Sequence, residues 1–283
     1  MPSFETRVML GWLEWSVMRQ TKYLCALATF VIAANLSISP ARSQDKRELI
    51  LSAQKAYYNL PTQGLVEFQC SVTPDWSAML KREMKTDFKP DNPALKLLNG
   101  VHFWVSVTAT GKVKMTHEVD SSPVSTSDLD NFQKAIGGIE ETTDGFWKAA
   151  STFLLTSALP KPESDYQLTE QNDEYLVSYR DGAYEIATRL GKDYSISEIK
   201  VTSAKLSSSI KPNFKKTDGG LLLTAYDAEY KLTPGNGAHV FWQLKYLDVE
   251  GLHLPAELTS QTSTDAGTHE VLLRFTDYQI KRR

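Results

Sequence analysis

Alternating hydrophobic and polar positions fill the chain after Asp165. Turn signals such as Asp181-Gly182 and Gly235-Asn236-Gly237 separate these repeats into segments of roughly ten residues. Successive side chains of a strand point to opposite faces, so each segment predicts a strand with one buried and one wet face. Short turns between consecutive strands favour an antiparallel meander.

The segment before Asp165 mixes helical and strand patterns. Apolar residues recur at helical spacing over Asp45–Asn59, and Leu65–Thr73 alternates as a half-buried strand does. Asp75 is a suitable cap for a short helix that runs through Met84. Residues 101–108 and 112–118 predict a hairpin about a Thr-Gly turn.

A second helical region is predicted over Ser125–Leu159. Phe146, Ala149 and Phe153 belong to one apolar stripe, and Pro160 ends the helix because proline cannot continue it. We expect the pair Gly137-Gly138 to interrupt the helix. The prolines and the asparagine of residues 89–93 predict a loop.

Together these elements predict an α+β fold. We expect a long, strongly curved antiparallel sheet of roughly ten strands, a half-barrel, with the helices packed against its concave face. The strands and helices leave little chain for a second hydrophobic core, so residues 44–283 are predicted to form a single domain.

The N-terminus carries the pattern of a secretory signal peptide. Arg19 and Lys22 precede the apolar run Tyr23–Ile38, and the small residues of Ala41-Arg42-Ser43 follow it. Residues 1–43 are therefore predicted to be a signal peptide, cleaved before Gln44, and the mature protein is predicted to be periplasmic.

Two features of this segment leave alternatives open. Met18 would begin a more regular signal than Met1 does, so the true start codon is in question. The run Tyr23–Ile38 could instead be an uncleaved anchor, although it is shorter than the roughly 20 residues that span a bilayer. Whether the protein is soluble or tethered to a membrane therefore stays open.

Composition excludes several classes of protein. The net charge is −3, from 31 Lys+Arg against 34 Asp+Glu, which argues against a protein built around a basic face for nucleic acid and leaves a local basic patch open. The mean hydropathy of −0.32 excludes a helical protein with many membrane spans.

Cys25 lies in the signal region, which leaves Cys70 without an internal disulfide partner. Cys70 alternates with apolar residues and is predicted to be a buried strand residue.

No catalytic or metal-binding motif is present. Metalloprotease, nucleophile-elbow, phosphate-loop, dinucleotide-binding and Cys-x-x-Cys patterns are all missing from the sequence. The five histidines are far apart in the chain, and His102 and His117 could meet only across the predicted hairpin. Catalytic residues, metal ligands and cofactors are therefore predicted to be absent, and the protein is predicted not to be an enzyme.

Aromatic residues are the most informative class. Phe103-Trp104 and Phe241-Trp242 each place one ring on either face of a strand, whereas a one-sided sheet needs only one apolar face. The extra rings are either surface aromatics or part of an apolar cavity for a ligand or partner.

The order of elements resembles the periplasmic lipoprotein-carrier superfamily, which includes the LolA-type lipoprotein chaperones and the LppX-like lipid-binding proteins. A signal peptide and the helix Asp45–Asn59 precede a first strand that opens with Gly64–Phe68. Asp248–Leu258 is similar to a glycine-to-proline strand start of the family, and Val271–Ile280 is similar to its final strand. No residue of this chain can be matched to the arginine that controls cargo release in those carriers.

The resemblance implies a non-enzymatic carrier or binding protein that holds a lipid, an acyl chain or a lipoprotein in an apolar cavity. It also implies a monomer, and it leaves open the cargo and any docking on a membrane-bound transporter or receptor. The cavity-lining residues chosen by alternation and ring size are Phe68, Trp104, Phe153, Tyr226, Trp242 and Phe275.

Three other classes remain as alternatives. The main one is an exported structural or interaction domain whose core is filled and binds no ligand. An outer-membrane barrel and a hydrolase with dispersed catalytic residues are the other two.

Overall fold

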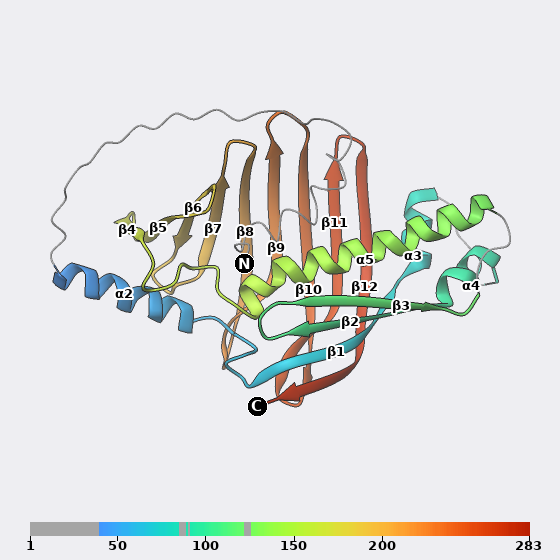
Figure 1. Ribbon diagram of the computed structural model, residues 1–283, viewed down its shortest axis with the longest axis horizontal. Coiled ribbons are helices and arrows are strands. Elements are labelled where there is room, and N and C mark those ends of the chain that lie inside the picture. Colours follow the sequence, from blue (N-terminus) through green and yellow to red (C-terminus); the bar gives the residue numbers. More distant parts are fainter. Residues whose placement is uncertain (1–39, 85–88, 90, 122–125) are drawn as a thin grey trace.

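The computed structural model describes residues 40–84, 89, 91–121 and 126–283. These form an α+β fold with a 12-stranded antiparallel sheet in the order β3-β2-β1-β12-β11-β10-β9-β8-β7-β6-β5-β4. The strands after residue 165 follow one another as a meander, as the alternation predicted (Figure 1). They are β4 (Tyr166–Gln171), β5 (Glu174–Asp181), β6 (Tyr184–Leu190), β7 (Ile196–Thr202), β8 (Leu206–Thr217), β9 (Gly220–Leu232), β10 (Gly237–Val249), β11 (Leu252–Thr264) and β12 (Gly267–Arg282).

The N-terminal part supplies the other three strands. β1 (Leu65–Pro74) pairs with both β12 and β2 (Val101–Thr108), and β2 forms the predicted hairpin with β3 (Val113–Val119). The first strand therefore lies beside the last one, and the sheet is held together by pairing between the two ends of the described chain.

The expectation of a strongly curved half-barrel is wrong. The sheet stays open, with β3 and β4 as its edges, and it is not strongly curled. Instead, β1–β3 run across the direction of β8–β11 (Figure 1). β12 has an irregularity in its pairing with β1, where Ser71 pairs with Thr276 but Gln69 pairs with Gln279. Such a bulge bends a strand and increases its twist, which redirects the strands without closing the sheet.

Four helices belong to the described residues: α2 (Pro40–Lys55), α3 (Trp76–Met84), α4 (Pro93–Asn99) and α5 (Thr126–Leu154). Asp75 caps α3 as predicted, since its Oδ1 accepts from the backbone N–H of Ala78 at 3.0 Å. The pair Gly137-Gly138 does not interrupt α5, which is continuous.

The predicted loop at residues 89–93 ends in a helix that the sequence analysis did not foresee. Asn92 accepts hydrogen bonds from the N–H groups of Ala94 and Leu95, and Pro93 occupies the first turn of α4. Proline in that position starts a helix, because its missing N–H would be unpaired there anyway.

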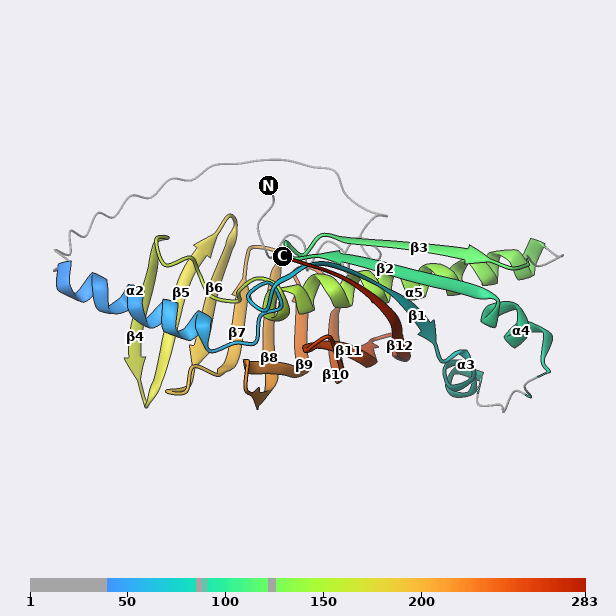
Figure 2. The ribbon, with the colours of Figure 1, turned by 90° about the horizontal axis from the view of Figure 1, so that it is seen from below.

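α2 ends earlier than the predicted Asn59. After Lys55 the backbone leaves the helix and pairs with β9: the carbonyl of Ala56 accepts from Leu221, and the N–H of Tyr58 donates to Leu221. In Figure 2, α2 lies alongside β4–β7. The residues predicted to form the signal peptide lie largely outside the described residues, and among those described no helix is both long and apolar enough to cross a membrane.

Gly220 makes this docking of α2 possible. Its φ is +118°, and a Cβ there would lie 2.6 Å from the carbonyl oxygen of Ala56. We expect Gly220→Ala to lower the free energy of unfolding by about 3 kcal/mol, from backbone strain and steric overlap together. Urea unfolding measures this change.

Gly267→Ala is the matched control for that substitution. Gly267 has a similar φ of +136°, but a Cβ there would meet nothing within 4 Å. Gly267→Ala should lower the free energy of unfolding by the strain contribution alone, about 1 to 2 kcal/mol. Equal losses in the two variants would show that the contact between Gly220 and the end of α2 has no energetic role.

Candidate functional site

The C-terminal half of α5 lies in the interior of the protein. From Gly145 to Leu154 every residue is buried except Lys148, which is half-buried. Lys148 pairs with Asp144 one turn earlier, at 2.6 Å between Nζ and Oδ2. A helix without a wet face must be covered by protein on several sides. The sheet and this part of α5 therefore enclose one apolar interior.

Five of the six predicted cavity residues face this interior. Their exposed fractions are between 1 and 6%, and the five are Phe68, Phe153, Tyr226, Trp242 and Phe275. They come from β1, α5, β9, β10 and β12, so the fold gathers rings that are far apart in the sequence.

Ring contacts join these residues into one aromatic run. Tyr226 stacks on Trp242 with ring centroids 4.4 Å apart, and Phe153 meets Tyr226 at 6.5 Å. Phe146 of α5 contacts both Trp242 and Phe275, at 5.5 and 5.8 Å. Edge and stacked contacts of this kind stabilise aromatic pairs beyond the area that they bury.

The sixth predicted residue, Trp104, is not part of the run. It lies half-buried on the opposite face of β2, while its neighbour Phe103 is 1% exposed and faces the core. Alternation correctly predicted that Phe103 and Trp104 lie on opposite faces of β2. The ring that faces the core is Phe103, however, and not the predicted Trp104. The strand starts with a buried valine, and this register turns Phe103 inward.

The sequence analysis also missed Trp147. Its ring lies 5.0 Å from Phe68 and 5.8 Å from Phe275, so it extends the aromatic run to β1. The adjacent residues Phe146 and Trp147 are both 0% exposed. Neighbouring helix positions point in different directions, so two adjacent large rings were a signal that α5 is covered on more than one side.

A small pocket reaches the aromatic run at the C-terminal end of α5. Thr152, Phe153 and Thr156 line it from the side of α5. Gln54 of α2, Tyr57 just after α2, and Ile196 of β7 line the other side. The space open to water is about 10 Å³, enough for about one water molecule.

Tyr57 fixes one wall of this pocket. Its hydroxyl donates to the carbonyl of Tyr194 at 2.6 Å and accepts from the N–H of Ile196 at 2.9 Å. Burial raises the pKa of Tyr57 well above its usual value, so the hydroxyl stays protonated and keeps both bonds. Gln54 donates to the carbonyl of Pro160 at 3.0 Å, which ties α2 to the chain after α5.

A few buried polar atoms along α5 and the sheet have no hydrogen-bond partner among the described residues. They are Thr143 Oγ1, Trp147 Nε1, Thr152 Oγ1, Thr188 Oγ1, Ser208 Oγ and Trp242 Nε1. Buried polar groups are normally paired, and an unpaired one costs about 1 to 3 kcal/mol. Two of these atoms belong to rings of the aromatic run.

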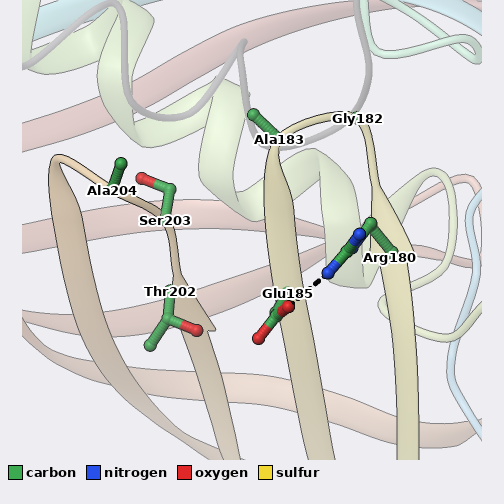
Figure 3. Close-up of a pocket in the computed structure, with 7 residues that line it drawn as sticks. All are labelled: Arg180, Gly182, Ala183, Glu185, Thr202, Ser203 and Ala204. Carbon is green, nitrogen blue, oxygen red and sulfur yellow. Dashed lines mark hydrogen bonds and ion pairs between the residues drawn. The ribbon is translucent and has the colours of Figure 1, made fainter. Parts of the chain in front are cut away.

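A second concavity, of about 500 Å³, lies between two hairpin tips (Figure 3). Arg180 and Glu185 point toward each other on one side of it and form an ion pair, while Ser203 lies on the neighbouring hairpin. Both charged side chains are largely exposed, and no aromatic ring lines the concavity. It is a surface notch and does not connect with the aromatic run.

Four of the five histidines each lie near one carboxylate. His117 lies 2.7 Å from Glu140 of α5, and His239 lies 2.7 Å from Asp227. His102 pairs with Asp120 rather than with His117. Among the described residues, no group of three histidine, cysteine or carboxylate side chains is placed to hold a metal ion.

Comparisons of the chain with protein families, with curated proteins and with solved structures find no match. The resemblance to lipoprotein carriers therefore stays a prediction, and no relative supplies a function for these residues.

Cys70 has the buried strand position that the alternation predicted, with 1% of its surface exposed. Burial raises the pKa of its thiol to about 12. At pH 8 only a fraction of about 10⁻⁴ of the Cys70 side chains is thiolate, the reactive form, compared with about a quarter for a free cysteine.

We expect an aromatic disulfide reagent to leave Cys70 unmodified in the native protein at pH 8 and to modify it fully in denaturant. Rapid labelling of Cys70 in the native protein, distinguished from Cys25 by peptide mapping, would contradict this assignment.

Proposed function

We propose that this protein is an exported, non-enzymatic carrier that holds the acyl chain of a lipid or lipoprotein between α5 and the sheet. One observation carries the proposal: an aromatic run begins at a pocket beside Phe153 and continues through Tyr226 and Trp242 into the interior. Rings that adjoin a pocket at the surface offer apolar contacts to a long apolar ligand once α5 moves aside.

Burial of the acyl chain would supply the binding energy. Each buried CH₂ contributes about 0.8 kcal/mol, so a chain of about sixteen carbons offers about 10 kcal/mol before ordering costs. No step of this binding needs a catalytic group or a cofactor.

Displacement of α5 would have to make room for the ligand, because the rings contact one another. Few polar contacts oppose that movement. Glu140 pairs with His117 of β3, and the carbonyl of Leu154 accepts from the N–H of Leu60 at 2.9 Å. The other contacts of α5 with the sheet are largely apolar, and an acyl chain can replace contacts of that kind.

A second candidate function is an exported interaction domain without a ligand. The close packing of the aromatic rings favours it, since stacked rings such as Tyr226 and Trp242 already fill the space between them. The two candidates differ in whether α5 can leave its position for an acyl chain.

Native mass spectrometry of the protein, purified without detergent from cells that export it, tests the carrier function. We expect a co-purifying lipid or acylated peptide, about one per protein, or uptake of palmitoyl phospholipid from vesicles. Phe153→Glu should reduce the bound fraction at least tenfold, because a carboxylate at the pocket repels an apolar chain. A clean protein mass without uptake would contradict the carrier function and favour the interaction domain.

Phe241→Glu is the matched control. Phe241 is a half-buried ring on the face of β10 opposite to Trp242, so this substitution should leave lipid binding unchanged. Thermal unfolding checks that each variant folds. If Phe153→Glu does not fold, Ser157→Trp fills the rim of the same pocket and should reduce uptake in its place.

A further inference from the structure

The turn between β6 and β7, residues 191–195, holds a backbone conformation that its sequence does not favour. Tyr194 has a φ of +66°, in the left-handed region. Short hairpin loops often end in that region, and glycine or asparagine is the usual residue there because a larger side chain is strained. Among the described residues, five other than glycine have a positive φ, and Tyr194 is the aromatic one. Contacts with its surroundings must therefore hold Tyr194 in place.

Two contacts from outside the 191–195 turn hold Tyr194. Its carbonyl accepts from the hydroxyl of Tyr57 at 2.6 Å, and the same hydroxyl accepts from the N–H of Ile196 at 2.9 Å. The ring of Tyr194 stacks on that of Tyr175 in β5, with centroids 6.5 Å apart. A single hydroxyl therefore joins the end of the turn to the chain that follows α2.

Tyr57 is the fixed side of this contact. The residues on either side of it hydrogen-bond to the backbone of Leu221 in β9. Its ring also meets Phe214 of β8 edge to face, with centroids 5.2 Å apart. The sheet thus holds Tyr57 independently of the 191–195 turn.

The 191–195 turn has its own internal hydrogen bonds. The N–H of Gly191 donates to the carbonyl of Ser195, and the N–H of Tyr194 donates to the carbonyl of Gly191, both at 2.9 Å. The carboxylate of Asp193 accepts from the N–H and the hydroxyl of Ser195. A turn with these bonds can move as one unit when its outside contacts break.

The contact between Tyr57 and the turn lies at the pocket beside Phe153. Tyr57 and Ile196 both line that pocket, and Ile196 directly follows the turn. The rings of Phe153 and Phe214 lie 5.9 Å apart, so the outer end of the aromatic run is next to Tyr57. A space of about 10 Å³ holds about one water molecule and is too small for an acyl chain. The pocket must widen before it can admit one.

We propose that the 191–195 turn is a strained latch that opens the pocket beside Phe153 to the acyl ligand. When the bond between Tyr57 and Tyr194 breaks, the backbone of Tyr194 relaxes to a favoured conformation, and the turn moves away from the pocket. This inference rests on the proposed carrier function and adds where the ligand enters and which contact controls entry.

Limited proteolysis of the ligand-free protein tests the latch. Lys192 lies in the turn, and the rate of trypsin cleavage after it follows the population of the open turn. Tyr57→Phe keeps the ring but removes the hydroxyl. We expect it to speed this cleavage about tenfold, the effect of losing about one buried hydrogen bond. Peptide mapping identifies the cleaved bond.

Tyr58→Phe is the matched control. The hydroxyl of Tyr58 accepts from the N–H of His253 in β11 at 2.8 Å and holds a different part of the sheet. This variant should leave cleavage after Lys192 at the natural rate.

Tyr194→Asn tests the role of strain, because asparagine tolerates the left-handed region. With that strain reduced, the turn has less to gain from release. In the Tyr194→Asn background, Tyr57→Phe should therefore speed cleavage by less than about threefold.

Uptake of palmitoyl phospholipid from vesicles tests control of entry. We expect Tyr57→Phe to take up lipid about tenfold faster than the natural chain, because the entry rate follows the fraction of open turn. Tyr58→Phe should take up lipid at the natural rate. Thermal unfolding checks that the variants fold. If Tyr57→Phe does not fold, Tyr175→Ala removes the ring that stacks on Tyr194 and should speed cleavage and uptake in its place.

Each outcome decides the inference. Cleavage at the natural rate in Tyr57→Phe would overturn the latch and leave the carrier function standing. Equal acceleration by Tyr57→Phe with and without Tyr194→Asn would show that strain does not drive release, which also overturns the latch. Faster cleavage with unchanged uptake would show that the turn does not control entry. No uptake by the natural chain would overturn the carrier function, and the latch with it, whatever the cleavage rates.

Discussion

The structure depends on the burial of the C-terminal half of α5. This segment has no wet face, so it is stable only where other elements cover it on several sides. β1, β9, β10 and β12 provide that cover through Phe68, Tyr226, Trp242 and Phe275. Each of these strands must keep its register, because a shift by one residue would turn its ring to the opposite face. The helix thus links strands from both ends of the described chain into one core.

Strands were predictable because their signal is local. Alternation and turn residues predict β5–β7 and β9–β12 directly, and a half-buried face is enough to produce that pattern. β8 was not predicted as a separate strand, because the turn that precedes it carries no glycine or proline signal. The continuity of α5 was not predictable from Gly137-Gly138. Glycine costs about 1 kcal/mol in a helix, and the apolar contacts made further along α5 outweigh that cost. The open shape of the sheet could not be predicted from the sequence either, since it depends on irregular pairings such as the one between β1 and β12.

The candidate site was predictable only in part. Alternation and ring size identified five rings that meet in the interior, although they lie on five different elements. The same rule failed for Trp104, since alternation alone does not say which of two apolar faces is covered. The rule also missed Trp147, because the apolar stripe of α5 was assumed to lie on one side of the helix only. The missing hydrogen-bond partners of Trp147 and Trp242 depend on tertiary packing and leave no trace in the sequence.

The packing around α5 also relates the two candidate functions to each other. A core built only for stability would favour phenylalanine where no acceptor is present, because an unpaired indole N–H costs free energy that a phenyl ring does not. Two such indoles, those of Trp147 and Trp242, contact Phe146 and have no hydrogen-bond partner among the described residues. Under the proposed carrier function, an acyl chain that enters beside α5 would replace apolar contacts with similar ones. The two candidate functions therefore differ in whether the apolar contacts of α5 can be exchanged for those of an acyl chain.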